Sequence, residues 1–514
     1  MSFYSNVITG MTTGNNNLFV RFWTEIDITK AAIGETDFDN IDIRKQYWIP
    51  YSKGGERRNW YGNTNYLVNW KRKDEFNRSK TTLQHFYLRE AVTWPFINTD
   101  TFSARYLPVG YLWDVAGSPC FFESDRMLKY CLGFLCSKVA ATMLSVINPT
   151  INVQAIDIEK LPIIINDKIM DDIISIVEQC IIISKSEWDS YELSWDFLRH
   201  PLANGGLIEE EFVKWRLKCE SWFDLIKANE EEINRLFIET YRVERDINSI
   251  VDERRITIRH AELTKDIKNL ISYSVGCMFG RYSFDEEGLI YAGGEWDISR
   301  YTTFIPDEDN CIPITDEEYF SDDIVGRFVE FVKTVYGAET LEENLDFIAR
   351  ALGNKGDTSR EVIRNYFLKD FYADHLKVYQ KRPIYWLFDS GKENGFKALI
   401  YMHRYDADTV GRVRTDYLHR AQKYVETAMQ SAQYTIDNAT SNSEKSKATK
   451  AVTKYTKQLA EMKIYDEAIA HIANKRIEID LDDGVKVNYE KFQGVEVAQE
   501  GKKSLKVDLL AKIK

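Results

Sequence analysis

Short aromatic and β-branched runs alternate with turn residues over the first 120 residues of the chain. Gly, Asn and Ser separate these runs, as at residues 14–17, 52–55 and 62–65. Runs of roughly four to eight such residues between turn signals are typical of strands. We therefore predict a β-rich N-terminal part with strands at residues 18–23, 46–51, 66–70, 85–88 and 105–115.

The spacing of apolar residues changes to three and four after Asp125. Met127, Cys131, Leu135 and Val139 fall on one helical face, which predicts a single amphipathic helix at residues 125–146. The same spacing predicts further helices at residues 168–185, 207–248 and 257–273.

Two kinds of local signal mark boundaries in the second half of the chain. Thr315-x-x-Glu318 and Thr358-x-x-Glu361 have the form of capping boxes and predict that helices start there. Gly288, Gly293 and Gly294, which lie between aromatic residues in the segment 278–306, predict a β-hairpin.

Apolar residues at spacings of three and four also line two arms within residues 413–476, joined by a polar tip at 438–446. This pattern predicts an antiparallel coiled-coil hairpin. The tail from Asp480 is polar and is expected to lie on the surface. The predicted fold class is α+β: a β-rich domain followed by a mainly helical region with a coiled-coil hairpin.

Charge is distributed unevenly along the 514 residues, whose formal net charge is −13. Residues 44–89 hold 11 basic and 3 acidic side chains, whereas residues 285–346 hold 18 acidic and 3 basic ones. Such asymmetry favours one surface that contacts a polyanion and another that is directed away from it. The alternative is that both segments are solvated faces without a partner.

The seven cysteines form an odd number and show no CxxC spacing. This is typical of reduced, mostly buried thiols in a cytoplasmic protein, not of a disulfide framework or a zinc site. The chain has no apolar run near the roughly 18 residues that span a bilayer, and no signal-peptide pattern. We therefore expect a cytoplasmic location and no membrane partner.

Common catalytic and cofactor signatures are missing from the sequence, namely GxxxxGK[ST], HExxH, GxSxG and GxGxxG. Cys277 adjoins a turn and is expected to be a buried thiol. The acidic residues at 307–323 lack the Gly and terminal Glu of a calcium loop and are expected to be solvated. Asn148-Pro149-Thr150 lacks the second proline and the aromatic residue of an Asn-Pro-Pro-Tyr motif. We expect no catalytic residue, metal site or bound cofactor in this chain.

Two stretches of the N-terminal part resemble known DNA-recognition modules. Residues 8–17, Ile-Thr-Gly-Met-Thr-Thr-Gly-Asn-Asn-Asn, followed by Phe19, resemble the entrance to target-recognition domains of type IIG and related DNA methyltransferases. Residues 132–138, Leu-Gly-Phe-Leu-Cys-Ser-Lys, then Asn148-Pro149-Thr150 and Leu161-Pro162-Ile163, resemble the end of such a domain. The same ending occurs in type I specificity subunits.

Four later motifs are together similar to the C-terminal half of one family. That family is the adenine-specific DNA methyltransferase of the BREX phage-defence system, called PglX. The motifs are Met278–Tyr282, Tyr291–Trp296, Arg382–Phe388 and Ile479–Tyr489.

The departure from the family is as informative as the match. Family members carry the S-adenosylmethionine-binding Gly-rich motif and the Asn-Pro-Pro-Tyr motif in an N-terminal half, and neither motif occurs here. The resemblance therefore implies a truncated, split or separately started C-terminal half, to which no catalytic residue can be carried over. S-adenosylmethionine is implied for the complete enzyme only. The implied partners are double-stranded DNA, a separate methyltransferase-domain chain and other BREX proteins.

The basic segment contains the residue types that a site-selecting module needs. Arg and Lys neutralise phosphates and hydrogen-bond to guanine edges. Aromatic residues interleaved with them are expected in the core of the β-fold rather than on DNA. Residues 444–463 of the second coiled-coil arm hold 6 Lys and 2 Glu and would tolerate a phosphate backbone. The predicted DNA-binding residues are Lys53, Arg57, Arg58, Lys71, Arg72, Lys73, Arg78 and Lys80.

The predicted function is the DNA-recognition part of an adenine-N6 DNA methyltransferase that works with a catalytic domain on another chain. The alternative is a scaffold that docks other defence proteins through its acidic middle and coiled coil, with incidental DNA contact. The predicted parts are a target-recognition domain (1–165), a helical spacer (166–275), an α+β domain with an acidic face (276–412), the coiled-coil hairpin (413–476) and a C-terminal tail (477–514).

Overall fold

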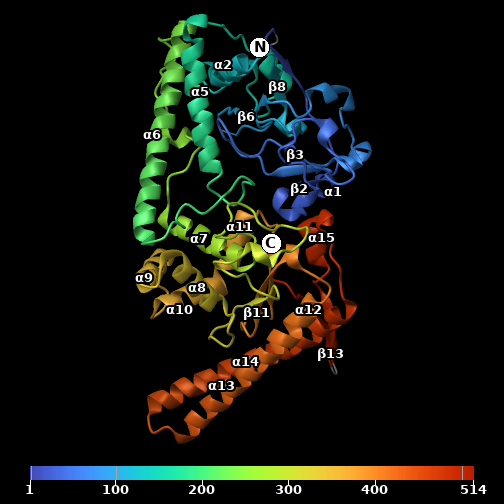
Figure 1. Cartoon of the computed structure of the whole chain (residues 1–514), viewed down its shortest axis with the longest axis vertical. Coiled ribbons are helices and arrows are strands. Elements are labelled where there is room, and N and C mark those ends of the chain that lie inside the picture. The colour runs from blue at the N-terminus through green and yellow to red at the C-terminus, as the bar shows by residue number, and fades with distance from the viewer. Residues whose placement is uncertain (2, 100, 500–501, 514) are drawn as a thin grey trace. The chain divides into compact units, whose positions relative to one another are not determined.

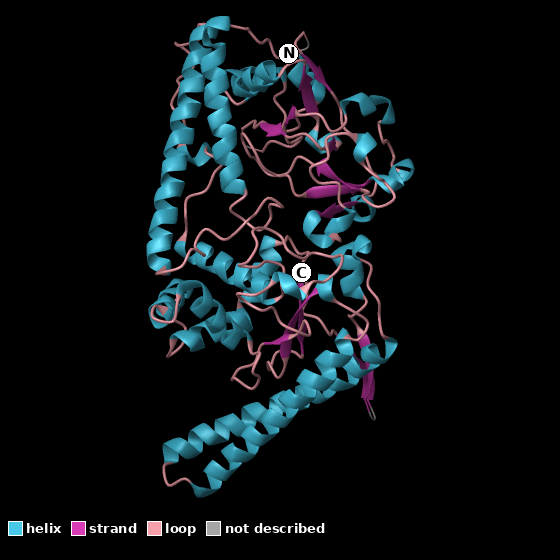
Figure 2. Ribbon diagram, viewed as in Figure 1, coloured by secondary structure: helices cyan, strands magenta, loops and turns pink. Residues whose placement is uncertain are grey.

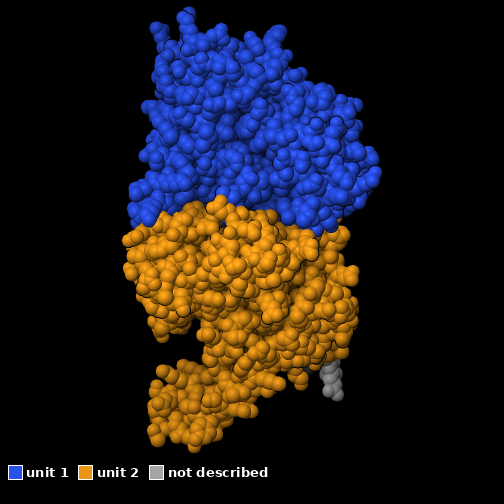
Figure 3. All heavy atoms as spheres, in the orientation of Figure 1, with its two compact units in different colours: residues 1–198, 213–262 blue, residues 199–212, 263–514 orange. Residues whose placement is uncertain are grey.

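The computed structural model describes residues 1, 3–99, 101–499 and 502–513. The fold is α+β, as predicted, with several small sheets and many helices (Figures 1 and 2). The chain forms two compact units, coloured separately in Figure 3. Unit 1 comprises residues 1–198 and 213–262, and unit 2 comprises residues 199–212 and 263–514. Each unit is therefore built from two separate segments of the chain.

Two four-stranded sheets lie in the N-terminal part of unit 1. The first has the order β1-β8-β5-β6 with antiparallel neighbours, and the second has the order β2-β4-β3-β7, in which only β3 and β7 are parallel. The β-rich prediction for this part is confirmed. The strands are β1 (Ser5–Val7), β2 (Val20–Phe22), β3 (Trp48–Ser52), β4 (Tyr66–Asn69), β5 (Ala91–Thr93), β6 (Arg105–Leu107), β7 (Leu112–Trp113) and β8 (Pro119–Phe122).

The strand predicted at residues 85–88 is wrong. Residues 85 and 86 instead end the 3-10 helix η5 (Thr81–Phe86). Lys80 before this helix and Leu88 after it have φ values of 59° and 61°. Positive φ is incompatible with an extended strand, so the chain turns at both ends of this segment.

The helices of unit 1 are α1 (Asn16–Phe19), α2 (Asp125–Leu135), α3 (Lys138–Ile147), α4 (Ala155–Glu159), α5 (Asp167–Trp188) and the part of α6 (Ile208–Tyr241) from residue 213 onward. Among them, α2 and α4 contact strands of the first sheet, whereas α1 contacts β2 of the second. Gly133 lets α2 approach α5 closely, because a Cβ atom there would lie 3.0 Å from side-chain atoms of both Ile173 and Val177. The Leu-Gly-Phe-Leu motif is thus a helix-packing element of the core.

The single helix predicted at residues 125–146 is two helices. The Ser137 hydroxyl accepts a hydrogen bond from the Ala140 N–H at 3.2 Å and so caps a new helix. The helices α2 and α3 are bent by 71° at this point. No single described helix is long and apolar enough to cross a bilayer, although α2 and α3 taken together meet the same criteria of length and composition.

Unit 2 is built around a small antiparallel sheet with the order β10-β11-β9. Its strands and helices are α7 (Leu263–Met278), β9 (Ile312–Pro313), α8 (Ile324–Tyr336), α9 (Leu341–Leu352), α10 (Ser359–Lys369), α11 (Phe371–Val378), β10 (Tyr385–Asp389), β11 (Lys397–Tyr401), α12 (Thr409–Arg412), α13 (His419–Asn438), α14 (Asn442–Lys475), α15 (Gly484–Glu490), β12 (Val495–Gln499) and β13 (Lys502–Val507).

The expectation that the tail lies on the surface is wrong. Tyr489, Phe492, Leu509 and Leu510 are buried. The Ala511 N–H donates to the Leu387 carbonyl at 2.8 Å, so the chain end continues the sheet beside β10.

The β-hairpin predicted at residues 278–306 is also wrong, because this segment contains turns and one short 3-10 helix. The Asp285 carboxylate accepts hydrogen bonds from the backbone N–H groups of Thr302 and Thr303 at 2.7 and 3.0 Å. A side chain therefore joins the two legs in place of a backbone ladder.

One of the two predicted helix starts is confirmed. The Glu361 N–H donates to the Thr358 hydroxyl at 3.2 Å, and α10 begins there. The Thr315 prediction is wrong because α8 begins after Asp323, whose carboxylate accepts from the Val325 N–H. The Asp323 side chain is fully buried and forms a bidentate ion pair with Arg364, with both distances 2.8 Å. The acidic run is thus not a uniformly solvated face.

The predicted helical hairpin at 413–476 is present. The helices α13 and α14 run side by side as an arm of unit 2, after a π-helical turn at Val413–Leu418 (Figure 1). Val425 of α13 and Ala448, Tyr455 and Met462 of α14 are buried. Its coiled-coil character remains a prediction.

Stability of unit 2 should fall below pH 6.5 because two of its histidines are buried. Burial lowers the pKa of His200 and of His375 to about 3. Unfolding then takes up a proton at each between pH 6.5 and 3, so stability present above pH 6.5 is lost at about 1.4 kcal/mol per pH unit for each histidine. Asp307, whose pKa burial raises to about 7, acts in the opposite direction.

The variant His375→Gln isolates one of these contributions. We expect its unfolding free energy to fall between pH 6.5 and 5 less steeply than that of the parent, by about 1.4 kcal/mol per pH unit. Urea titrations at several pH values measure this difference. Equal slopes in the two proteins would contradict it.

Candidate nucleic-acid interface

The basic segment 44–89 contains β3, β4, η4 (Trp70–Glu75) and η5. The aromatic residues expected in the core are buried there, which confirms that interpretation. They are Trp48, Tyr51, Trp60, Tyr61 and Trp70. The basic side chains of the segment therefore have to be considered separately from its rings.

Three of the eight predicted DNA-binding residues are engaged within unit 1. The Lys53 ammonium lies 3.0 Å from the buried Asp114 carboxylate. Arg57 donates to the Arg255 carbonyl at 2.6 Å. The loop that carries them follows β3 and packs against the segment after α6. These contacts bind the loop to its own unit.

Arg58 is an interior residue. Its guanidinium forms an ion pair with Glu187, whose side chain is 1% exposed. It also donates to the Tyr61 carbonyl at 2.7 Å and lies 4.9 Å from the ring centroid of Trp188. A buried charge that is held in this way has a structural role, and we leave Arg58 and Lys53 out of the interface.

The other five predicted residues lie in one stretch, η4 and the turn that follows it. Figure 1 shows this region near α1 and β2. Arg72 and Glu75 form an exposed ion pair, whose hydrogen bond raises the pKa of Arg72 and lowers that of Glu75. Exposed pairs of this kind exchange readily for other anions. The five residues are Lys71, Arg72, Lys73, Arg78 and Lys80.

This basic stretch pairs directly with the N-terminal Gly-Asn motif. The N–H of Arg78 donates to the Thr12 carbonyl and the N–H of Thr12 donates to the Arg78 carbonyl, both at 3.0 Å. The Phe19 ring lies 5.0 Å from the Phe76 ring and 4.9 Å from the Arg72 guanidinium. The motif at 8–19 and the basic stretch thus form a single surface.

Gly14 is required for this close approach. Its φ is +80°, and a Cβ atom on it would lie 2.6 Å from the Asn77 side-chain oxygen. Any other residue would clash and would strain the turn. The sequence Thr-Gly-Asn-Asn-Asn therefore bends at Gly14, which lies against Asn77 of the basic stretch.

We call residues 12–19 and 70–80 the basic–asparagine surface. Asn15, Asn17 and Asn77 are exposed on it. Asparagine amides can hydrogen-bond to the N6 and N7 edge of adenine, while Lys and Arg bind phosphates or guanine. The arrangement can therefore provide both base readout and backbone contact.

The sequence-based prediction missed these asparagines. It counted positive charge over 44–89 and treated residues 14–17 as a turn. The available signal was the presence of three consecutive asparagines inside the recognition-like motif. Their position next to Asn77, 60 residues away, became visible only in the fold.

The later motifs assemble a buried cluster in the core of unit 2. Arg281 is buried and donates to the Tyr401 hydroxyl at 2.9 Å. The Tyr401 hydroxyl in turn donates to the Tyr291 carbonyl at 2.9 Å, and the Arg404 guanidinium lies 4.0 Å from the Trp296 ring centroid. The first two motifs, at 278–282 and 291–296, thus contribute to the buried core of unit 2.

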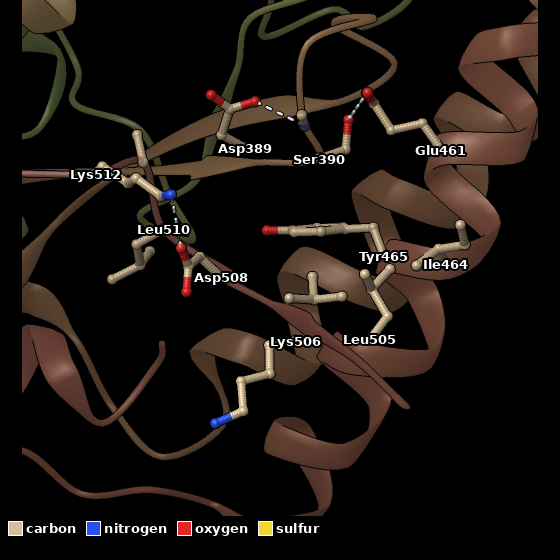
Figure 4. Close-up of a pocket in the computed structure, with 13 residues that line it drawn as sticks. Asp389, Ser390, Glu461, Ile464, Tyr465, Leu505, Lys506, Asp508, Leu510 and Lys512 are labelled. Carbon is tan, nitrogen blue, oxygen red and sulfur yellow. Dashed lines mark hydrogen bonds and ion pairs between the residues drawn. The ribbon is translucent and has the colours of Figure 1, made fainter. Parts of the chain in front are cut away.

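A cavity of about 360 Å³ lies within unit 2, between the end of β10, α14 and the chain end (Figure 4). The Glu461 carboxylate accepts from the Ser390 hydroxyl and from the N–H groups of Glu393 and Gly395. The Asp389 carboxylate accepts from the Gly391 N–H. Because these acids satisfy their own loops, and no glycine-rich strand-to-helix turn adjoins the cavity, its residues do not fit S-adenosylmethionine.

Metal ligands and thiols are the other groups of the described residues that could support chemistry. The described residues contain no group of three or more His, Cys, Asp or Glu side chains placed to hold a metal ion. All seven cysteines are free thiols and only Cys136 is not fully buried, as predicted. Burial raises the pKa of the Cys311 thiol well above its usual range, which disfavours a reactive thiolate at that position. Burial also raises the pKa of Tyr273, a neighbour of Cys277, well above its usual range.

Comparison with known proteins identifies relatives of the chain. No protein-family model matches it. It is 42% identical over 505 residues to the adenine-specific methyltransferase PglX of Lacticaseibacillus casei (strain Zhang). It is 35% identical over 515 residues to the adenine-specific methyltransferase BrxX of Escherichia coli O9:H4 (strain HS). Each alignment includes 94% of this chain and 42% of the relative, so the chain spans less than half the length of these curated relatives.

Proposed function

We infer that this chain, which is related to the PglX-type adenine-specific methyltransferases, is the DNA-recognition part of such an enzyme in a BREX phage-defence system. The observation that carries this proposal is the basic–asparagine surface. It joins a segment with exposed asparagines to a stretch with five basic residues through the backbone pairing of Thr12 and Arg78.

The chemistry of adenine methylation supports a separate recognition module. An enzyme that modifies a base amino group must extrude that base from the duplex. Other residues must then select the site through base edges and hold the register through phosphates. The basic–asparagine surface offers both kinds of contact and contains no reacting group.

Catalysis and cofactor binding are assigned to a part of the enzyme outside these residues. In this proposal the chain corresponds to the C-terminal part of its relatives. A methyltransferase domain outside these residues binds S-adenosylmethionine and carries out the transfer. Duplex DNA, that catalytic domain and other BREX proteins are the proposed partners. The support is the identity to relatives more than twice as long, together with a cavity that does not fit the cofactor.

Sequence preference tests the proposal. Selection from a random duplex pool by the full chain should enrich a defined motif. The double variant Asn15→Ala, Asn17→Ala should relax the preference by about 1–3 kcal/mol, roughly 5- to 150-fold, for each base contact that is lost. Asn40→Ala, an exposed asparagine elsewhere in unit 1, is the control and should leave the motif unchanged.

Two results would contradict this function. Failure of the parent to enrich any motif would favour a docking scaffold with incidental DNA contact. A motif that survives the double variant unchanged would move base readout away from the basic–asparagine surface.

A further inference from the structure

One face of α14 is basic along almost its whole outer half. Residues 445–460 contain five lysines and no acidic residue. Lys447, Lys450, Lys454 and Lys457 follow one another at spacings of three, four and three, which places them on one side of the helix. All four are exposed. We call these four residues the lysine face.

Buried residues lie on a different face of α14. Ala448, Tyr455 and Met462, spaced seven residues apart, are buried. A Cβ atom on Gly395 would lie 2.9 Å from the Met462 side chain, and the Tyr455 hydroxyl donates to Glu317 at 3.4 Å, so this buried face packs against the rest of unit 2. The four lysines remain exposed on another side of the helix.

Contacts near the base of the arm fix α14 both to the start of the arm and to the rest of unit 2. The Asp466 carboxylate accepts from Arg414 at 2.7 Å and lies 2.9 Å from the His419 ring nitrogen. The Gln458 amide donates to Asp316 at 3.1 Å. Glu461, one turn beyond the lysine face, is bound by the loop at 390–395. The arm thus presents its lysines from an anchored, regular helix.

Within the lysine face, only Lys454 has an ion-pair partner among the described residues. Its ammonium lies 2.5 Å from the Asp316 carboxylate. Lys447, Lys450 and Lys457 form no such pair in the described chain. Three adjacent, exposed and uncompensated cations in a chain of net charge −13 indicate an anionic partner.

The dimensions of the face match a duplex backbone. Ten residues separate Lys447 from Lys457, which is about 15 Å along a helix. One strand of B-form DNA carries about four phosphates over that length. The lysine ammonium groups act as flexible point charges suited to phosphates. The hydroxyls of Thr449, Thr453 and Thr456 are already engaged, because they donate to carbonyls of their own helix.

We propose that the lysine face of α14 binds the phosphate backbone of duplex nucleic acid without sequence preference, as a second contact site of this chain. This proposal rests on the proposed DNA-recognition function and extends it. The arm would add affinity, while the basic–asparagine surface would determine the sequence that is bound.

The test uses the full chain with Lys447, Lys450 and Lys457 changed to Gln, which preserves helix propensity. A matched control changes Lys333, Lys355 and Lys377 of unit 2, three exposed lysines outside the arm, to Gln. Fluorescence anisotropy with a scrambled duplex is recorded over a series of salt concentrations. We expect the slope of log affinity against log salt to flatten by up to ~2.7 in the arm variant, and not in the control.

Each outcome separates this proposal from the proposed function. An arm variant that binds like the parent at every salt concentration overturns the second contact site, and leaves the recognition function to the motif selection described above. If the arm variant keeps its affinity for the duplex but loses its affinity for poly-glutamate, the partner of the lysine face is an acidic protein. That result also overturns the proposal. Flattened slopes with an unchanged selected motif support it, and circular dichroism should show the parental helix content.

Discussion

When Lys71, Lys73, Arg78 and Lys80 are changed to alanine, the full chain should bind duplex DNA at 0.1 M salt up to ~10^3.6-fold more weakly than the parent chain does. This factor takes the extrapolated affinities of the variant and the parent to be equal at 1 M salt. Each phosphate that is neutralised contributes about 0.9 to the slope of log affinity against log salt. Four lost contacts therefore flatten the slope by up to ~3.6. Filter binding over a salt series measures both quantities.

Of these four residues, Lys71 and Arg78 are exposed and Lys73 and Lys80 are half-buried. The variant avoids Arg58 and Lys53, whose removal would leave Glu187 or Asp114 buried without a partner. It also leaves Arg72 in place, because its exchange with Glu75 would complicate the slope.

A matched control keeps the change in composition and charge identical. Lys160, Lys168, Lys218 and Arg245 are exposed in unit 1 outside the segment 44–89. Their change to alanine should leave the slope near that of the parent. If both quadruple variants bind alike, the basic–asparagine surface is not the phosphate contact.

The difference between Arg58 and Lys71 shows what a charge count can and cannot predict. Both lie in the same basic segment, and sequence gives them equal weight. Arg58 pairs with Glu187, 129 residues away, and becomes an interior group. Lys71 has no such partner among the described residues and stays exposed. Only the tertiary fold determines which cations remain available for a ligand.

Helices were predicted more reliably than the connections between them. Apolar spacing is a local property, and α5 and α14 follow it closely. The turn at 278–306 instead depends on the Asp285 carboxylate bonding to Thr302 and Thr303, which replaces strand pairing. Similarly, the division into interleaved units depends on which segments pack together, and no local pattern marks residue 199 or 213 as a boundary.

The candidate site also depends on tertiary packing that the local sequence does not predict. The residue types of a DNA-binding surface were visible in the sequence, but their grouping was not. Thr12 and Arg78 are joined by two backbone hydrogen bonds, and this pairing carries the asparagine motif to the lysines. A positive φ at Gly14 makes the approach possible. Such long-range pairing has no signature in residue spacing.

Truncating Glu187 to alanine should destabilise unit 1 by about 3–5 kcal/mol. Its carboxylate is 1% exposed and pairs with Arg58, which is itself buried. Removing one partner of a buried pair leaves the other charge without compensation, and that desolvation cost dominates. Arg259, 3.8 Å from Glu187, would not restore the lost partner because it is also a cation. Urea unfolding followed by tryptophan fluorescence measures the loss.

Glu178→Ala is the control on the same helix, since Glu178 is half-exposed and pairs with Lys129. Exposed pairs contribute about 0–1 kcal/mol, so this variant should unfold close to the parent. The double variant Arg58→Met, Glu187→Leu should recover much of the loss, because an apolar pair of similar volume leaves no buried charge. A Glu187→Ala protein no less stable than Glu178→Ala would mean that water reaches Arg58. Arg58 would then return to the set of residues available to DNA.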